Sequence, residues 1–165
     1  MRHKKTHLRG SNKMFKNTLL KILTLVTGLA ISMSAFSAPA DSPLPETFAE
    51  HKIVLQISDF HPGKQTLVLN VAGNLLKHYA GQEVDMEIVS FGPGARLMFD
   101  GNINDTRIQT LMDAGVRFSV CGNTITNMAK KLGHEPEIRD GITRVKAGAA
   151  RILQLNTAGW KLLKP

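Results

Sequence analysis

From residue 52 onward the chain alternates between short β-rich runs and longer stretches with helical periodicity. This alternation restricts the fold more than any other feature. Strands that alternate with helices form βαβ units over a parallel sheet, with right-handed crossovers. We therefore predict an α/β fold, namely a three-layer α/β/α sandwich with a five-stranded, mainly parallel sheet. The runs that predict its strands are 52–58, 84–91, 116–121, 142–147 and 160–164.

Four helical stretches lie between these runs, and each has an apolar stripe at helical period. The first covers about 64–79 and the second follows Asn104 as its N-cap. The third has Asn123 or Thr124 as its predicted N-cap. The fourth ends before Gly159, and its predicted inward residues are Ala149, Ile152 and Leu153.

The front of the chain has a different character. Residues 1–40 carry seven of the 21 Lys and Arg residues and none of the 13 Asp and Glu residues. A basic head, an apolar run at 22–36 and small residues behind it are the order of a secretory signal peptide. The run is shorter than the roughly 20 residues that span a membrane. We predict a signal peptide over 1–40 that is cleaved after Ala40 or Ser37, with Met14 as a second possible start and a retained anchor as the alternative.

The remainder of the chain is close to neutral, with 14 bases against 13 acids. We therefore expect no nucleic-acid partner. Residues 41–51 contain two prolines and are predicted to be a flexible lead-in, followed by one α/β domain over 52–165. Because no cysteine lies at the cleavage site to carry a lipid, we expect no stable membrane anchor and a periplasmic location.

Cys121 is the only cysteine, so the chain cannot form an internal disulfide. It falls where the third predicted strand ends and the third helix begins. Unpaired backbone N–H groups and the positive end of a helix dipole favour a thiolate there, and a thiolate is nucleophilic. Cys121 is therefore the candidate catalytic residue. The alternative is a small buried hydrophobe, which is the common state of free cysteines.

The remaining candidate residues are weaker indicators of a functional site. The histidines lack metal-ligand spacing, and no metal or cofactor site is expected. Asp59 and His61 share a strand-end loop, which suits either an acid–base pair or a solvated loop. The segment at 91–96 holds two glycines without a phosphate-binding spacing, and it could cradle an anion or form a plain turn.

Several blocks of the chain resemble the DsrE/DsrF-like proteins, in particular a branch of small exported members. They are "KIVLQISD", "LNVAGNLL", "VDMEIVSFGPGARLM", "GVRFSVCGNTI" and "ITRVKAGAARILQLNTAGWKLLKP", which together extend over about 52–165. The resemblance implies a five-stranded α/β/α domain that forms trimers or hexamers. It also implies sulfur relay, in which a cysteine at the end of this strand carries a persulfide. That role corresponds to Cys121 alone.

Two functions remain from the sequence, and the residues do not decide whether the protein is an enzyme. One is a periplasmic sulfur carrier or sulfurtransferase-like protein that receives sulfur on Cys121 from a donor protein or small sulfur compound and passes it to an acceptor. The other is a non-catalytic oligomeric module that binds a small molecule or a protein and has a structural cysteine. Fold analogy also allows a nucleotide or flavin site.

Overall fold

The computed structural model describes residues 42–80 and 82–165, and the predicted signal peptide at 1–40 lies outside them. The described residues form one sheet of five parallel strands in the order β4-β3-β2-β1-β5. The strands are β1 (His51–Ile57), β2 (Val84–Ser90), β3 (Arg117–Cys121), β4 (Thr143–Val145) and β5 (Lys161–Leu163). All five predicted strands are confirmed, with boundaries that differ by one or two residues.

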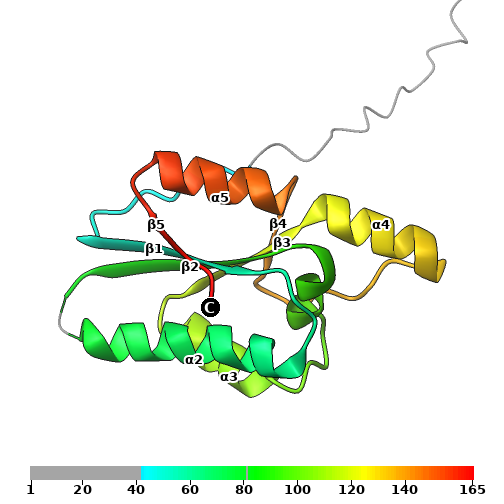
Figure 1. Ribbon diagram of the computed structural model, residues 1–165, viewed down its shortest axis with the longest axis horizontal. Helices are drawn as coiled ribbons and strands as arrows, with labels where there is room; N and C mark the ends of the chain where they lie inside the picture. The colour runs from blue at the N-terminus through cyan, green and yellow to red at the C-terminus, as the bar shows by residue number, and fades with distance from the viewer. Residues whose placement is uncertain (1–41, 81) are drawn as a thin grey trace, which may run out of the picture. The chain divides into compact units, whose positions relative to one another are not determined.

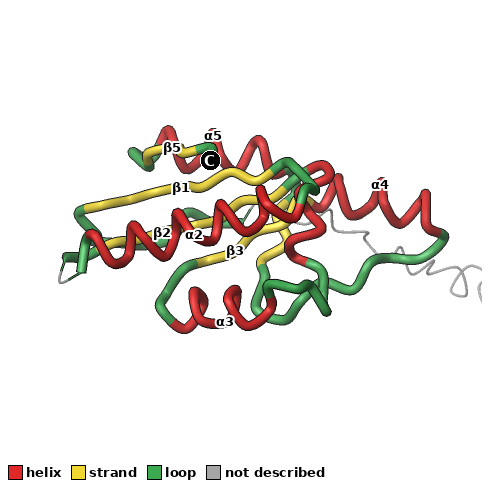
Figure 2. The backbone as a smooth tube through the Cα atoms, turned by 60° about the horizontal axis from the view of Figure 1, so that its bottom comes forward, coloured by secondary structure: helices red, strands yellow, loops and turns green. Residues whose placement is uncertain are grey.

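Helices cover both faces of this sheet, which confirms the predicted α/β/α class (Figure 1). Helices α2 (Pro62–His78) and α3 (Asp105–Asp113) lie on one face, and α5 (Gly148–Thr157) lies on the other. Helix α4 (Gly122–Leu132) extends past the carboxyl ends of the strands (Figure 2). The 3-10 helix η1 (Gly92–Met98) follows β2, in the segment that was predicted as a turn or an anion cradle.

The strands alternate between the two faces, as side chains do along any strand. In β1, Ile53, Leu55 and Ile57 pack in the larger apolar cluster with α2 and α3. Val54 points to the opposite face and packs in a smaller cluster with Ile152 of α5. Both faces of the sheet are therefore buried, as expected when helices cover a parallel sheet on both sides.

Helix α4 begins earlier than predicted. Its N-cap is Cys121, with an extended backbone (φ −69°, ψ 113°), and not Asn123 or Thr124. Gly122 makes this immediate start possible, because a Cβ at that position would lie 3.0 Å from the carbonyl oxygen of Val145. The strand therefore passes into the helix without a connecting loop, and Cys121 belongs to both elements.

The inward face of α5 also differs from the prediction. Ala149 and Leu153 are exposed, Leu153 by 68%. The helix buries Ile152 as predicted, together with Gly148, Arg151 and Leu155. The prediction counted only apolar side chains as inward-facing. It misplaced the buried face of α5 by about one residue, because two of the four buried positions are a glycine and an arginine.

Residues 42–50, within the predicted lead-in, contain no helix or strand. Two of their carbonyl groups are nevertheless held by the domain, because Arg151 donates from Nη1 to the oxygens of Ser42 and Pro43 at 2.9 and 3.0 Å. Gln154 donates to the same Ser42 oxygen at 3.4 Å. The segment is thus tied to α5 at its first described residues.

Candidate functional site

Cys121 lies at the carboxyl edge of the sheet, as the sequence predicted. It shares a face of β3 with Ser119, which is the face covered by α5. The residue is only 6% exposed. A value this low fits both a packed small side chain and a thiol in a nearly closed site, so the groups around the sulfur must distinguish between them.

Those groups are hydrogen-bond donors. The Thr124 side chain and the backbone N–H groups of Gly148, Thr124 and Asn123 lie close enough to the sulfur to lower its pKa, although the Asn123 N–H makes its own hydrogen bond to the Lys146 carbonyl oxygen at 3.2 Å. Burial alone raises the pKa of the Cys121 thiol, since it disfavours the charged form. The donors stabilise the thiolate more than burial opposes it, so that the pKa lies below its ordinary value. The site therefore favours ionisation of its cysteine.

Two helix N-termini meet at the sulfur. The amides of Asn123 and Thr124 belong to the first turn of α4, and the amide of Gly148 begins α5. A Cβ on Gly148 would lie 3.2 Å from the Cβ of Cys121 and 3.0 Å from that of Phe91. Helix α5 thus comes as close to the cysteine as a residue without a side chain permits. The sequence predicted the dipole of α4 at this point but not that of α5.

Thr124 is itself held in place by the segment after β2. The backbone N–H of Gly92 donates to Thr124 Oγ1 at 2.9 Å. This bond uses an acceptor site of the hydroxyl and leaves its proton available to a second partner. Gly92 has a φ of +54°, which favours glycine at this position. The segment predicted as a turn or a cradle therefore orients a side chain of the site.

The elements around the thiol carry three cations, namely Arg144 of β4, Lys146 directly after that strand and Arg151 of α5. Val145 is the sheet partner of Cys121, and it is flanked by Arg144 and Lys146. Arg144 forms an ion pair with Glu135 at the surface. Arg151 lies in the first turn of α5. Arg144 is paired with Glu135 and Arg151 with Glu87, so it is the hydrogen-bond donors, and not these cations, that lower the pKa of the thiol.

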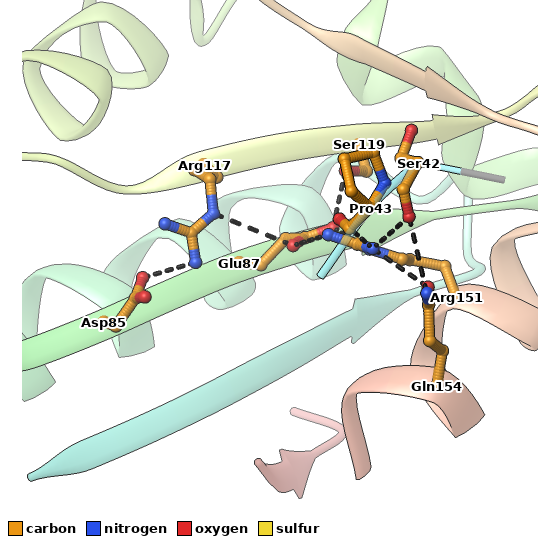
Figure 3. Close-up of polar contacts among 8 residues, drawn as sticks. All are labelled: Ser42, Pro43, Asp85, Glu87, Arg117, Ser119, Arg151 and Gln154. Atoms are coloured by element: carbon orange, nitrogen blue, oxygen red, sulfur yellow. Dashed lines mark hydrogen bonds and ion pairs between the residues drawn. The ribbon is translucent and has the colours of Figure 1, made fainter. Parts of the chain in front are cut away.

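A buried network of three polar residues, Glu87, Ser119 and Arg151, joins α5 to the sheet (Figure 3). Glu87 of β2 accepts hydrogen bonds from Arg151 and from Ser119. None of the three was predicted from the sequence. A signal was present, since the strand 84–91 places Asp85 and Glu87 on one face of a sheet that the fold class buries on both faces.

The weaker candidates have structural roles. Asp59 Oδ1 accepts from the backbone N–H of His61 at 2.8 Å, and His61 Nδ1 accepts from that of Gly63 at 3.1 Å. His61 is thus the N-cap of α2, and the pair shapes an exposed turn. Within 42–80 and 82–165, no three His, Cys, Asp or Glu side chains are grouped to hold a metal ion. No helix in the same ranges has the length and apolar character to cross a membrane.

Two surface hollows lie away from the cysteine. One of about 520 Å³ lies between α2 and α3, where Lys77 and Arg107 are among its lining residues. The other, of about 280 Å³, lies at the start of β1 beside Tyr79 and Lys161. Cys121 lines neither hollow.

The fold is similar to that of proteins of known structure. No family model matches the chain, and no curated protein matches it. Among solved structures, it is similar to MTH1491 from Methanobacterium thermoautotrophicum, described as a protein of unknown function. The TM-score is 0.63 and the identity 22%, over 70% of this chain and 100% of that one. The ychN protein from E. coli gives a TM-score of 0.50 and 16% identity, over 70% and 99%. These likenesses show that the chain has a DsrE/YchN-like fold.

Proposed function

We propose that the protein is an exported sulfur carrier that holds sulfane sulfur as a persulfide on Cys121. The observation that carries this proposal is the set of donors around a nearly closed thiol, namely three backbone amides and the Thr124 hydroxyl. These donors favour the thiolate, which is the nucleophile in sulfur transfer. The sequence resemblance to DsrE/DsrF-like proteins supports the same chemistry.

The loading step balances without an external oxidant. With thiosulfate as donor, Cys121 Sγ attacks the sulfane sulfur and forms a new S–S bond. The S–S bond of thiosulfate breaks, its electron pair leaves with sulfite, and the negative charge passes to the terminal sulfur of a perthiolate. An acceptor thiolate then attacks that terminal sulfur and releases Cys121 as a thiolate.

Mass spectrometry of the intact protein tests this step directly. Incubation with thiosulfate or polysulfide should add about 32 Da, located on Cys121 by peptide mapping and reversed by a reductant. Cys121→Ser should gain no mass under the same conditions. A wild-type protein that takes up no sulfur from either donor, with a thiol that resists alkylation in the native state, would refute the proposal.

The location belongs to the same proposal. Export to the periplasm is supported by the basic head, apolar run and small residues of 1–40. Cell fractionation followed by N-terminal sequencing should find the mature chain in the periplasmic fraction, starting at Asp41 or Ala38. A chain recovered in the cytosol with residues 1–40 still attached would contradict it.

A second candidate function is a non-catalytic oligomeric binding module, and the 6% exposure of Cys121 favours it. Cys121→Ala would then retain biological activity, whereas a sulfur carrier would lose it. A trimer or hexamer fits both functions. It is supported by the edge strand β5, where Leu162 and Leu163 are exposed by 43% and 40%. Light scattering on the purified protein would measure the subunit number.

A further inference from the structure

We propose that Arg151 is a positioning residue for Cys121, because its buried ion pair with Glu87 holds the first turn of α5 against the thiol. This inference rests on the proposed function, in which Cys121 reacts as a thiolate. The Arg151–Glu87 pair would thereby influence a sulfur atom to which neither partner is hydrogen-bonded.

The pair has the geometry of a rigid link. Arg151 donates from Nε to Glu87 Oε1 and from Nη2 to Glu87 Oε2, both at 2.9 Å (Figure 3). Two parallel bonds of this kind fix the direction of the guanidinium as well as its distance. Glu87 is 1% exposed and Arg151 is 6% exposed, so solvent cannot substitute for either partner.

The same carboxylate also holds the strand that carries the cysteine. Ser119 Oγ donates to Glu87 Oε1 at 2.6 Å. Ser119 precedes Cys121 by two residues in β3 and therefore points to the same face of the sheet. One oxygen atom of Glu87 thus joins β3, which carries the thiol, to α5, which brings an N–H group to it.

The link acts on the part of α5 that touches the site. Arg151 lies three residues after Gly148 on the same buried face of the helix. The N-cap residue Ala147 makes no side-chain cap, and the first turn contains no acid. The ion pair is therefore the polar contact between this turn and the sheet, and it sets how close the Gly148 N–H lies to the sulfur.

The outer side of the guanidinium is also occupied. Nη1 donates to the carbonyl oxygens of Ser42 and Pro43 and to Gln154 Oε1. These acceptors bind Nη1, while Glu87 binds Nε and Nη2 on the other side of the guanidinium. A guanidinium can serve both sets with its five N–H groups, the two of Nη1 being shared among three acceptors, whereas a lysine ammonium is a single point charge with three donors.

Arg151→Lys is the variant that isolates this geometry, because it keeps the charge but loses the planar fork. The assay is the rate of Cys121 alkylation by iodoacetamide across pH in the purified protein. We expect the midpoint of the profile to move up by about half a pH unit or more, with the same limiting rate at high pH. Arg139→Lys is the matched control, since Arg139 pairs with Asp105 of α3 on the other face, and it should leave the midpoint unchanged.

Glu87→Gln distinguishes an effect of the position of α5 on the alkylation midpoint from an effect of the charge of Arg151. If the charges acted only through the local field, the unbalanced Arg151 and Arg117 cations in this variant would lower the midpoint. Loss of the bidentate link predicts a higher midpoint instead. Should either variant fail to fold, Ser119→Ala removes the tie on the strand side and should also raise the midpoint.

The outcomes distinguish this inference from the function on which it rests. A wild-type midpoint below that of an ordinary thiol, left unchanged by Arg151→Lys and by Ser119→Ala, would overturn the positioning role and leave the sulfur-carrier proposal standing. A wild-type midpoint at the ordinary thiol value, with no sulfur uptake, would remove the proposed function itself.

Discussion

Replacing Thr124 by valine tests whether a side-chain donor, in addition to the helix amides, holds the thiolate of Cys121. Valine keeps the branched shape at Cβ and removes the hydroxyl. The hydroxyl accepts from Gly92 N–H at 2.9 Å and is one of the groups that lower the pKa of Cys121. The substitution therefore removes one donor from the sulfur and one acceptor from the backbone of η1.

The expected size follows from what a hydrogen bond to a charged group is worth. That contribution is about 1.5–3 kcal/mol, and one pKa unit corresponds to about 1.4 kcal/mol. Thr124 is partly exposed, so water replaces some of the lost interaction. We expect the pKa of Cys121 to rise by about one unit, which lowers the thiolate fraction about tenfold below the midpoint. The lost bond to Gly92 should cost about 1 kcal/mol of unfolding free energy.

The measurement is the pH profile of alkylation, and it reports one site because Cys121 is the only cysteine. Thr124→Ser keeps the hydroxyl and should retain a midpoint near that of the wild type. Thr126→Val removes a hydroxyl from the exposed side of the same helix, where it accepts from Arg144, and serves as the control. If Thr124→Val and Thr126→Val both titrate like the wild type, the hydroxyl has no part in holding the thiolate.

Three other predictions concern stability and are measured by chemical denaturation. Gly148→Ala should lower the free energy of unfolding by about 1–3 kcal/mol, because its Cβ has no room, whereas Gly73→Ala, with open space around it in α2, should raise it by up to about 1 kcal/mol. A chain that lacks residues 42–46 loses two carbonyl acceptors of a buried guanidinium and should be less stable by about 1–3 kcal/mol. Because the folded pKa of Cys121 lies below that of the unfolded thiol, the unfolded state binds more protons between the two values. Stability should therefore rise with pH there and be lost as pH falls through the folded value, and Cys121→Ala should lack this dependence.

The position of Cys121 could be predicted from the sequence because it depends only on local patterns. The run 116–121 has the composition of a strand, and Gly122 is followed by a helical stripe. In a parallel sheet the end of each such strand lies at one edge, so the thiol had to lie at that edge next to helix amides. Neither step requires knowledge of a distant contact.

The rest of the site depends on contacts between distant parts of the chain. Gly148 reaches Cys121 because β4 pairs with β3 and α5 then turns back over the sheet, and the strand order was not predictable from periodicity. Arg151 was missed because an arginine in a helix is ordinarily read as solvent-exposed. Its burial makes sense only with Glu87, 64 residues earlier in the chain.

The choice between a packed and a reactive cysteine depends on the donors more than on exposure. A small hydrophobe at this position would leave the Gly148 amide and the Thr124 hydroxyl facing an apolar side chain, and unsatisfied buried donors cost free energy. A thiolate satisfies them. Burial alone would raise the pKa of Cys121, whereas the observed surroundings lower it, so burial and donors together favour the proposed nucleophile over a small packed hydrophobe.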